Sequence, residues 1–239
     1  VSPAPGRRAL MELYGSEFGG KTRGTLEHRI FCPACETELL RFWFELGFGM
    51  EQAYGFAPID LLGGLPKPGG DIVIEPLNGN NRAAFESFFP IIAMAHARPP
   101  VWAGAPESYL DDLRKGFREL FDDRESMTIV AMAGGRAAGY QVWRPEKGEA
   151  IELAVSGTLP GERGKGIGRA LTAFGAGRAA REGYRVCLTD WKTANPLSST
   201  FFPSIGFEPY LYRLVRRFTP DIIDDGEKVL SGAVYGPPR

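Results

Sequence analysis

Apolar and polar residues follow two different periods in the larger, C-terminal part of the chain, and these periods predict its elements. Short runs rich in apolar and β-branched residues predict strands, whereas apolar residues that recur every three or four positions predict helices. Strands are predicted at residues 71–76, 127–133, 137–144, 150–155, 184–189 and 207–215. Helices are predicted at residues 80–95, 106–121, 166–181 and 196–204. Strands interleaved with single helices indicate an α/β (α+β) fold in which helices flank a mixed sheet.

A stretch rich in glycine and proline separates this region from a shorter one before it. Both residue types interrupt helices and strands, so the stretch is predicted to be a linker. The shorter region has a predicted strand, helix and strand, at residues 28–31, 36–46 and 48–56. Its sequence FWFELGF (42–48) parallels FFPSIGF (201–207), which indicates that the two regions are related. The predicted parts are an N-terminal segment (1–57), a linker (58–70), a main domain (71–218) and a C-terminal extension (219–239).

Composition narrows the class of protein. The chain has 239 residues, of which 44% are hydrophobic and 24% charged, as in ordinary globular proteins. Its 28 Lys and Arg against 29 Asp and Glu give a formal charge of −1, which provides no field to attract nucleic acid or an anionic membrane. Neither partner is expected. No run of about 18 apolar residues predicts a membrane span, and the start of the chain lacks the pattern of a signal peptide.

Cysteine and histidine provide no clear metal site. Three cysteines are too few for a disulfide framework and fit a reducing compartment, so we expect a cytoplasmic protein. Cys32 and Cys35, in the sequence CPAC, suit a redox pair or half of a zinc site. No second cysteine pair or histidine pair completes four ligands, and no metal is expected. His28 and His96 have no partners near them in sequence and are interpreted as structural.

The segment ERGKGIGRAL, residues 162–171, places three glycines and several cations between a predicted strand and a predicted helix. Glycine lets backbone N–H groups approach an anion closely, and a helix start adds unpaired donors and the positive end of the helix dipole. The sequence does not fit a P-loop, because Lys165 is followed by Gly166 and not by Ser or Thr. It does not fit a dinucleotide fingerprint either, because Arg169 and Leu171 occupy positions that require glycine.

The pattern RxxGxG at Arg163, Gly166 and Gly168 resembles that of the GNAT superfamily of acyl-CoA-dependent N-acetyltransferases. The resemblance continues downstream, where Asn195, Phe202 and the pair Gly206–Phe207 follow in the order of the family's Asn-initiated helix and Gly-Phe pair. It covers roughly residues 71–218 and implies a GNAT-type central twisted mixed sheet flanked by helices. With the shorter region as a degenerate, partial GNAT-like segment, it also implies a tandem arrangement.

This resemblance implies that acetyl-CoA, or another acyl-CoA, is the cosubstrate of an N-acetyl transfer to a small-molecule or peptide amine. The glycine loop would hold the pyrophosphate, and strand 151–155 would separate from strand 184–189 to admit the pantetheine arm. Backbone N–H groups near the end of the first strand would polarise the thioester carbonyl. The implied cofactor-binding residues are Leu153, Ala154, Val155, Arg163, Gly164, Lys165, Gly166, Ile167, Gly168, Arg169, Asn195, Ser199 and Phe202.

Glu152 is the candidate base, because a carboxylate that is partly screened from water can have a pKa near neutrality; the alternative is a strand Glu that faces solvent. Phe202 stands where the family usually has a tyrosine as general acid, and it has no proton to give. Ser199 and Ser204 either bond the thiolate or only cap the helix, and Asn195 either bonds the cofactor or caps its helix. A non-catalytic acyl-CoA-binding module, or a structural interaction protein, is the alternative function.

Overall fold

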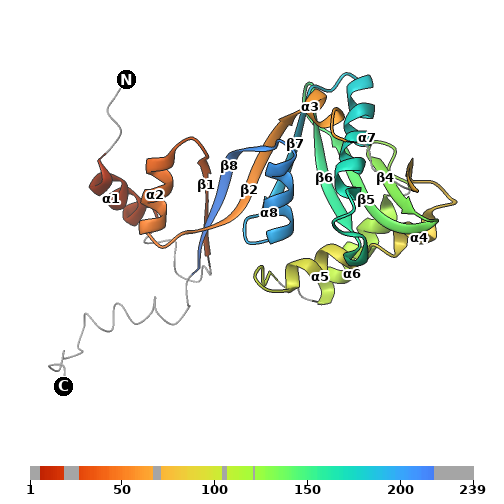
Figure 1. Ribbon diagram of the computed structural model, residues 1–239. Helices are drawn as coiled ribbons and strands as arrows, with labels where there is room; N and C mark the ends of the chain where they lie inside the picture. The colour runs from red at the N-terminus through yellow and green to blue at the C-terminus, as the bar shows by residue number, and fades with distance from the viewer. Residues whose placement is uncertain (1–5, 19–26, 67–70, 104–106, 121, 218–239) are drawn as a thin grey trace. The chain divides into compact units, whose positions relative to one another are not determined.

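The computed structural model describes residues 6–18, 27–66, 71–103, 107–120 and 122–217 (Figure 1). The predicted C-terminal extension, 219–239, lies outside the described residues, as do residues 67–70 of the predicted linker. The chain divides into two compact units, one of residues 1–51 with 212–239 and the other of residues 52–211. This division differs from the predicted boundaries, and the assignment of residues 1–57 as a GNAT-like segment stays a prediction.

The strands form a mixed sheet in the order β1-β8-β2-β7-β6-β5-β4-β3, which confirms the predicted α/β fold. Strands β6 and β7 pair in parallel, whereas β2–β7, β3–β4, β4–β5 and β5–β6 pair antiparallel. The strands are β1 (Glu27–Pro33), β2 (Gly49–Pro58), β3 (Ile72–Pro76), β4 (Met127–Ala133), β5 (Arg136–Pro145), β6 (Ala150–Thr158), β7 (Val186–Lys192) and β8 (Glu208–Arg217).

Helices of the larger unit depart from the predicted pattern at two places. The predicted helix 80–95 is two short helices, because Pro90 has no N–H to donate and its ring disfavours a continuous helix. Part of the predicted linker is ordered, since β2 runs to Pro58 and a short helix follows it. The helices are α3 (Ile59–Gly63), α4 (Arg82–Glu86), α5 (Ile91–Ala97), α6 (Glu107–Glu119), α7 (Ile167–Arg181) and α8 (Pro196–Ser204), with a 3-10 turn η1 (Pro160–Glu162) before α7.

Successive side chains of β5 point to opposite faces of the sheet, so they pack in two different cores. Tyr140 and Val142 pack with Phe85 and Phe88 in a cluster that also includes residues of α5 and β4. On the other face, α7 runs along β4, β5 and β6 (Figure 1). There Gln141 Nε2 donates to Thr172 Oγ1 of α7 at 2.9 Å, so a buried polar pair joins helix and sheet.

The smaller unit contains α1 (Arg7–Phe18), β1, α2 (Thr37–Glu45), the first residues of β2 and the end of β8. Tyr14 packs edge-on against Trp43 and Phe48, and its hydroxyl lies 2.8 Å from His28 Nδ1. Burial lowers the pKa of His28, in keeping with its structural interpretation. Cys32 is buried and is a free thiol. Across the part of the chain that the structure describes, no three His, Cys, Asp or Glu side chains form a group suited to a metal ion.

None of the helices in the described segments is both long and apolar enough to cross a membrane.

Candidate active site

Strands β6 and β7 separate part-way along their length. Their parallel pairing runs from Ala150 opposite Val186 to Glu152 opposite Leu188, and no further pair is recorded in the described strands. On its other side β6 has a bulge, because Val142 pairs with Val155 but the next residue, Trp143, pairs with Leu153. Ala154 is the extra residue, and a bulge leaves backbone groups out of the ladder. The separation therefore begins where strand backbone is available to a ligand.

The glycine loop ends at an open helix start. Gly164 has φ +78° and Gly166 has φ +80°, the left-handed region that favours glycine. Gly166 is the N-cap of α7, with no side-chain cap bond and no acidic residue in the first turn. The first N–H groups of α7 consequently have neither a side-chain cap nor a neighbouring carboxylate on the helix, an arrangement that favours an anion.

Gly168 is needed for a different reason. A Cβ at this position would lie 3.1 Å from the Phe201 ring of α8, so its absence allows α7 and α8 to pack closely. By contrast, a Cβ at Gly164 or Gly166 would meet nothing within 4 Å. Two glycines of the loop thus serve its conformation, and the third serves the contact between two helices.

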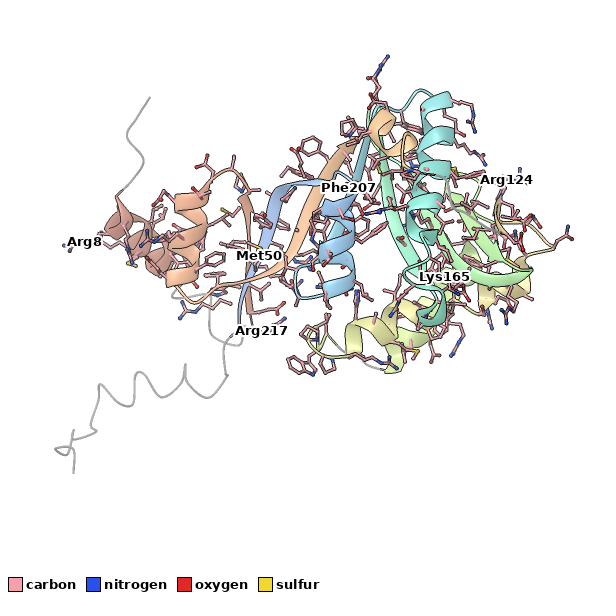
Figure 2. All side chains as sticks on the ribbon, viewed as in Figure 1. Arg8, Met50, Arg124, Lys165, Phe207 and Arg217 are labelled. Atoms are coloured by element: carbon pink, nitrogen blue, oxygen red, sulfur yellow. The ribbon has the colours of Figure 1, made fainter. Side chains whose placement is uncertain are left out.

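The cations of the loop differ in their contacts. Lys165, in the turn before α7 (Figure 2), forms an exposed ion pair with Glu162 at 2.9 Å. Arg163 and Arg169 line a cavity of the larger unit. Arg169 also donates to Ser204 Oγ at 3.4 Å, which ties it to α8. Arg163 and Arg169 are therefore better placed than Lys165 to meet an anion.

A cavity of about 1280 Å³ joins the separated strands to the glycine loop. All of its lining residues belong to the larger unit, residues 52–211. The sequence-predicted residues that line it are Leu153, Ala154, Val155, Arg163, Gly164, Gly166, Ile167, Gly168, Arg169, Asn195 and Phe202. Glu152, Lys165 and Ser199 are not among its lining residues. The structure thus brings most of the predicted cofactor residues, from β6, the glycine loop, α7 and α8, to one cavity.

Three polar side chains at α8 form hydrogen bonds with the backbone of the helix. Asn195 Oδ1 accepts from the Leu197 N–H at 3.1 Å, so the capping interpretation of Asn195 is observed. Ser199 Oγ donates to the Asn195 carbonyl at 2.7 Å, and Ser204 Oγ donates to the Phe201 carbonyl at 2.7 Å. Both hydroxyls therefore donate within the helix, which matches the capping alternative for these serines, while the Ser204 oxygen also accepts from Arg169.

Comparison with known proteins decides the family. Residues 91–207 match the model of the acetyltransferase (GNAT) family. These residues are a GNAT acetyltransferase domain. No curated protein sequence gives a significant match. The predicted family and fold class are confirmed, while the tandem arrangement stays a prediction.

Solved structures share the GNAT fold at low sequence identity. A conserved protein of unknown function from Staphylococcus epidermidis is 16% identical, with a TM-score of 0.59 over 90% of this chain and 82% of that one. A GNAT-family acetyltransferase from Colwellia psychrerythraea is 15% identical, with a TM-score of 0.58 over 90% and 75%. The PaiA N-acetyltransferase of Thermoplasma acidophilum, solved with coenzyme A, is 15% identical, with a TM-score of 0.50 over 62% and 99%.

Phe202 is an anchor of the GNAT domain and not a proton donor. Its ring is buried and stacks on Trp191 of β7, with centroids 5.5 Å apart. It also meets Phe207 edge-on at 5.5 Å; Phe207 lies where α8 leads into β8 (Figure 2). Trp191 is held in turn by β2, since a Cβ at Gly55 would lie 2.6 Å from the indole. The aromatic stack fixes α8 against the sheet beside the cavity.

Glu152 is half-buried, and burial is the main cause that raises the pKa of its carboxyl. The nearby carboxylates of Asp190 and Glu146 raise this pKa further, and Arg144 opposes them. The register places Glu152 beside Arg144 on one side and Leu188 on the other, so Asp190, two residues on, shares its face of the sheet. The predicted base is therefore next to the cavity wall, with Asp190 on the wall itself.

Several residues at this end of the cavity have no signal in the sequence. Gln52 of β2 donates from Nε2 to Asp190 Oδ2, although the two are far apart in the chain. His96 of α5 also lines the cavity; burial lowers its pKa, Lys192 lowers it further, and Asp190 opposes this. No local pattern could group residues from β2, α5 and β7, because only the folded sheet brings them together.

Proposed function

We propose that the chain transfers an acetyl group from acetyl-CoA to the amine of a small molecule or peptide. One observation carries this proposal: a single cavity connects the unpaired backbone at Ala154 with the uncapped start of α7 at Gly166. The family and the coenzyme A complex of the PaiA neighbour support an acyl-CoA as cosubstrate. The choice of the acetyl group and of an amine acceptor belongs to the proposal.

The described residues fit the parts of an acyl-CoA. The pyrophosphate needs donors and positive charge, which the first N–H groups of α7 with Arg163 and Arg169 provide. The cavity of about 1280 Å³ exceeds the size of most drug-sized sites, as an elongated cosubstrate requires. The separated edge of β6 offers backbone donors near the reacting carbonyl.

Acetyl-CoA would supply the acetyl group as a thioester. In the proposed reaction, Glu152 accepts a proton from the attacking amine, directly or through one water molecule. Backbone N–H groups at the bulge, around Ala154, stabilise the negative charge that develops on the carbonyl oxygen. Phe202 and Trp191 close the wall behind the thioester with apolar surface, which excludes water.

The acceptor would be a cationic amine with an apolar part. Tyr54 pairs with Asp190 in the register, and Phe56 pairs with Leu188, the neighbour of Glu152. Phe56 and Tyr210 are 37% and 43% exposed, with ring centroids 6.3 Å apart. Aromatic faces attract cations, and the carboxylates beside them add charge attraction. This surface of the larger unit therefore supports an amine that carries an aliphatic or aromatic group.

The cosubstrate site is tested by an isosteric pair of variants, Gly166→Asp and Gly166→Asn. Both new residues tolerate the left-handed backbone of Gly166 and both cap helices well, so they differ mainly in charge. The carboxylate would repel the pyrophosphate from the start of α7. We expect Gly166→Asp to bind acetyl-CoA about tenfold more weakly than Gly166→Asn, as measured by titration calorimetry at low salt.

Calorimetry on the native chain accompanies this comparison. Absence of acetyl-CoA binding to the native chain would refute the proposed function. Equal affinities of the two variants would show that the pyrophosphate lies elsewhere.

A second function is favoured by one observation, the phenylalanine at position 202. A domain that lacks the family's tyrosine would suit acyl-CoA binding without catalysis. The two functions are distinguished by following release of the CoA thiol in the presence of alkyl, aromatic and peptide amines. Tight acetyl-CoA binding without thiol release for any of these amines would favour the binding module.

A further inference from the structure

The three serines of α8 differ in what their hydroxyls do. Ser199 and Ser204 donate to backbone carbonyls of their own helix. The Ser198 hydroxyl oxygen is buried and has no hydrogen-bond partner among the residues that the structure describes. A buried polar group without a partner costs about 1–3 kcal/mol, so an unpartnered hydroxyl of this kind requires an explanation.

The position of Ser198 provides that explanation. Ser198 lies one helical turn before Phe202, so both residues share a face of α8. Both line the cavity, together with Leu153 and Val155 at the separated end of β6. Ser199, one residue further on, is not among the lining residues. Of the three serine hydroxyls in the helix, the one without a partner is therefore on the face where the thioester is proposed to lie.

We propose that the Ser198 hydroxyl, turned toward the cavity by rotation about its Cα–Cβ bond, donates a hydrogen bond to the sulfur of CoA, in place of the hydroxyl that Phe202 lacks. The proposal rests on the proposed function and adds a residue that touches the leaving group. In the reaction, the nitrogen–carbon bond forms, the carbon–sulfur bond breaks, and the electron pair remains on sulfur as a thiolate. The ammonium group of the bound acceptor first gives one proton to solvent, which frees the lone pair on nitrogen, and the proton that nitrogen loses as the new bond forms goes to Glu152. Ser198 keeps its own proton, since an alcohol is too weak an acid, and the released thiolate takes a proton from water.

The decisive measurement needs no acceptor, because it uses CoA itself as the probe. The thiolate of bound CoA absorbs in the ultraviolet, so a pH titration of the saturated complex reports the pKa of the bound thiol. A donor to the sulfur favours the thiolate. We expect Ser198→Ala to raise the pKa of the bound thiol by about one unit, equivalent to about tenfold less thiolate at intermediate pH.

Two variants control this experiment. Thr200→Ala removes a hydroxyl from an exposed position on the same helix and should leave the thiol titration as in the native chain. Ser198→Ala combined with Phe202→Tyr supplies a hydroxyl one turn later and should return the pKa of the thiol toward the native value. The double variant carries the same Ser198→Ala substitution, so any change in packing that this substitution causes would persist in it. A return of the thiol pKa would therefore be due to the new hydroxyl.

Affinity for desulfo-CoA, which lacks the thiol, separates a contact with sulfur from a contact with the pantetheine arm. We expect Ser198→Ala to bind desulfo-CoA as the native chain does and to bind CoA more weakly at alkaline pH. An unchanged thiol titration, or equal losses of affinity for CoA and desulfo-CoA, would overturn the assignment of Ser198 and leave the proposed function intact. Failure of the native chain to bind CoA would overturn both.

Discussion

Replacing Glu152 with glutamine should lower kcat for acetyl transfer by about a hundredfold or more, with little change in affinity for acetyl-CoA. The amide keeps the shape of the side chain but cannot accept the proton of the attacking amine. Glu152 is not among the cavity-lining residues, so binding of the cosubstrate should persist. Steady-state kinetics with the first amine that the native chain acetylates, alongside calorimetry with acetyl-CoA, measures both quantities.

The pH dependence provides an independent check on this role. Burial and two neighbouring carboxylates raise the pKa of Glu152 above the ordinary value of 4.5, and the deprotonated form is the active one. The native rate should therefore rise with pH through this raised pKa, and this rising limb of the pH–rate profile should be missing in Glu152→Gln. Glu146→Gln removes a neighbouring carboxylate, so it should move the limb to lower pH and keep the plateau.

Stability should change in the opposite direction to activity. The folded chain holds the Glu152 proton more tightly than the unfolded chain, so stability falls as pH rises from 4.5 through the raised pKa. Glu152→Gln removes this loss and should melt at a higher temperature than the native chain at neutral pH. The difference should vanish well below pH 4.5, where the carboxyl is protonated in both states.

Asp190 is the alternative base, because it lines the cavity and shares the face of Glu152. A full loss of rate in Asp190→Asn, together with near-native turnover of Glu152→Gln, would transfer the role to Asp190.

Gly175→Ala should destabilise the larger unit by about 2–3 kcal/mol. A Cβ at Gly175 of α7 would lie 2.4–2.5 Å from three atoms of the Trp143 indole, too close for any real contact. Trp143 is fully buried, and its Nε1 donates to Gln141 Oε1 at 3.1 Å. Gln141 in turn bonds Thr172 on the same helix, so a displaced indole would also disturb this buried network. Thermal and urea unfolding both measure the loss.

Gly177→Ala, two positions further along α7, is the matched control. A Cβ there would meet only the end of the Arg181 side chain, at 4.0 Å. Alanine has a higher helix propensity than glycine by about 1 kcal/mol, so this variant should be more stable than the native chain. Similar losses in Gly175→Ala and Gly177→Ala would contradict the contact with Trp143 as the cause.

Local patterns predicted much of the fold. The predicted strand 127–133 matches β4 residue for residue, and the predicted helix 196–204 has the same bounds as α8. Their residues carry strong local signals, such as the Asn195 cap and the pair Gly134–Gly135, where a tight turn needs positive φ. The long helix predicted at 80–95 is wrong because Pro90 interrupts it, although the apolar period continues on both sides of the proline.

The candidate site was predictable only where it is local. The loop from Arg163 to Arg169 is a contiguous segment, and two of its glycines adopt a positive φ before α7. The sequence alone could therefore indicate this loop as a candidate site. The end of the cavity near Glu152 and Asp190 is formed by β-sheet register, and no sequence pattern links Gln52 to Asp190. Within α8 the choice between Ser198 and Ser199 depends on which hydroxyl meets a backbone carbonyl, and only three-dimensional contacts show this.

The separation of β6 from β7 means that the sheet of the larger unit is interrupted at its centre. Three residue pairs of the described strands hold β6 and β7 together, the Thr189 hydroxyl donates to the Leu153 carbonyl just beyond them at 2.9 Å, and no pair follows further along the described part of β6. On the proposed function, the amide groups of the pantetheine arm fill this gap as a short substitute strand. The cosubstrate then completes the architecture, so the empty protein should open more readily along this line than the loaded one, and protection of the β6 amides from hydrogen exchange becomes a direct readout of occupancy.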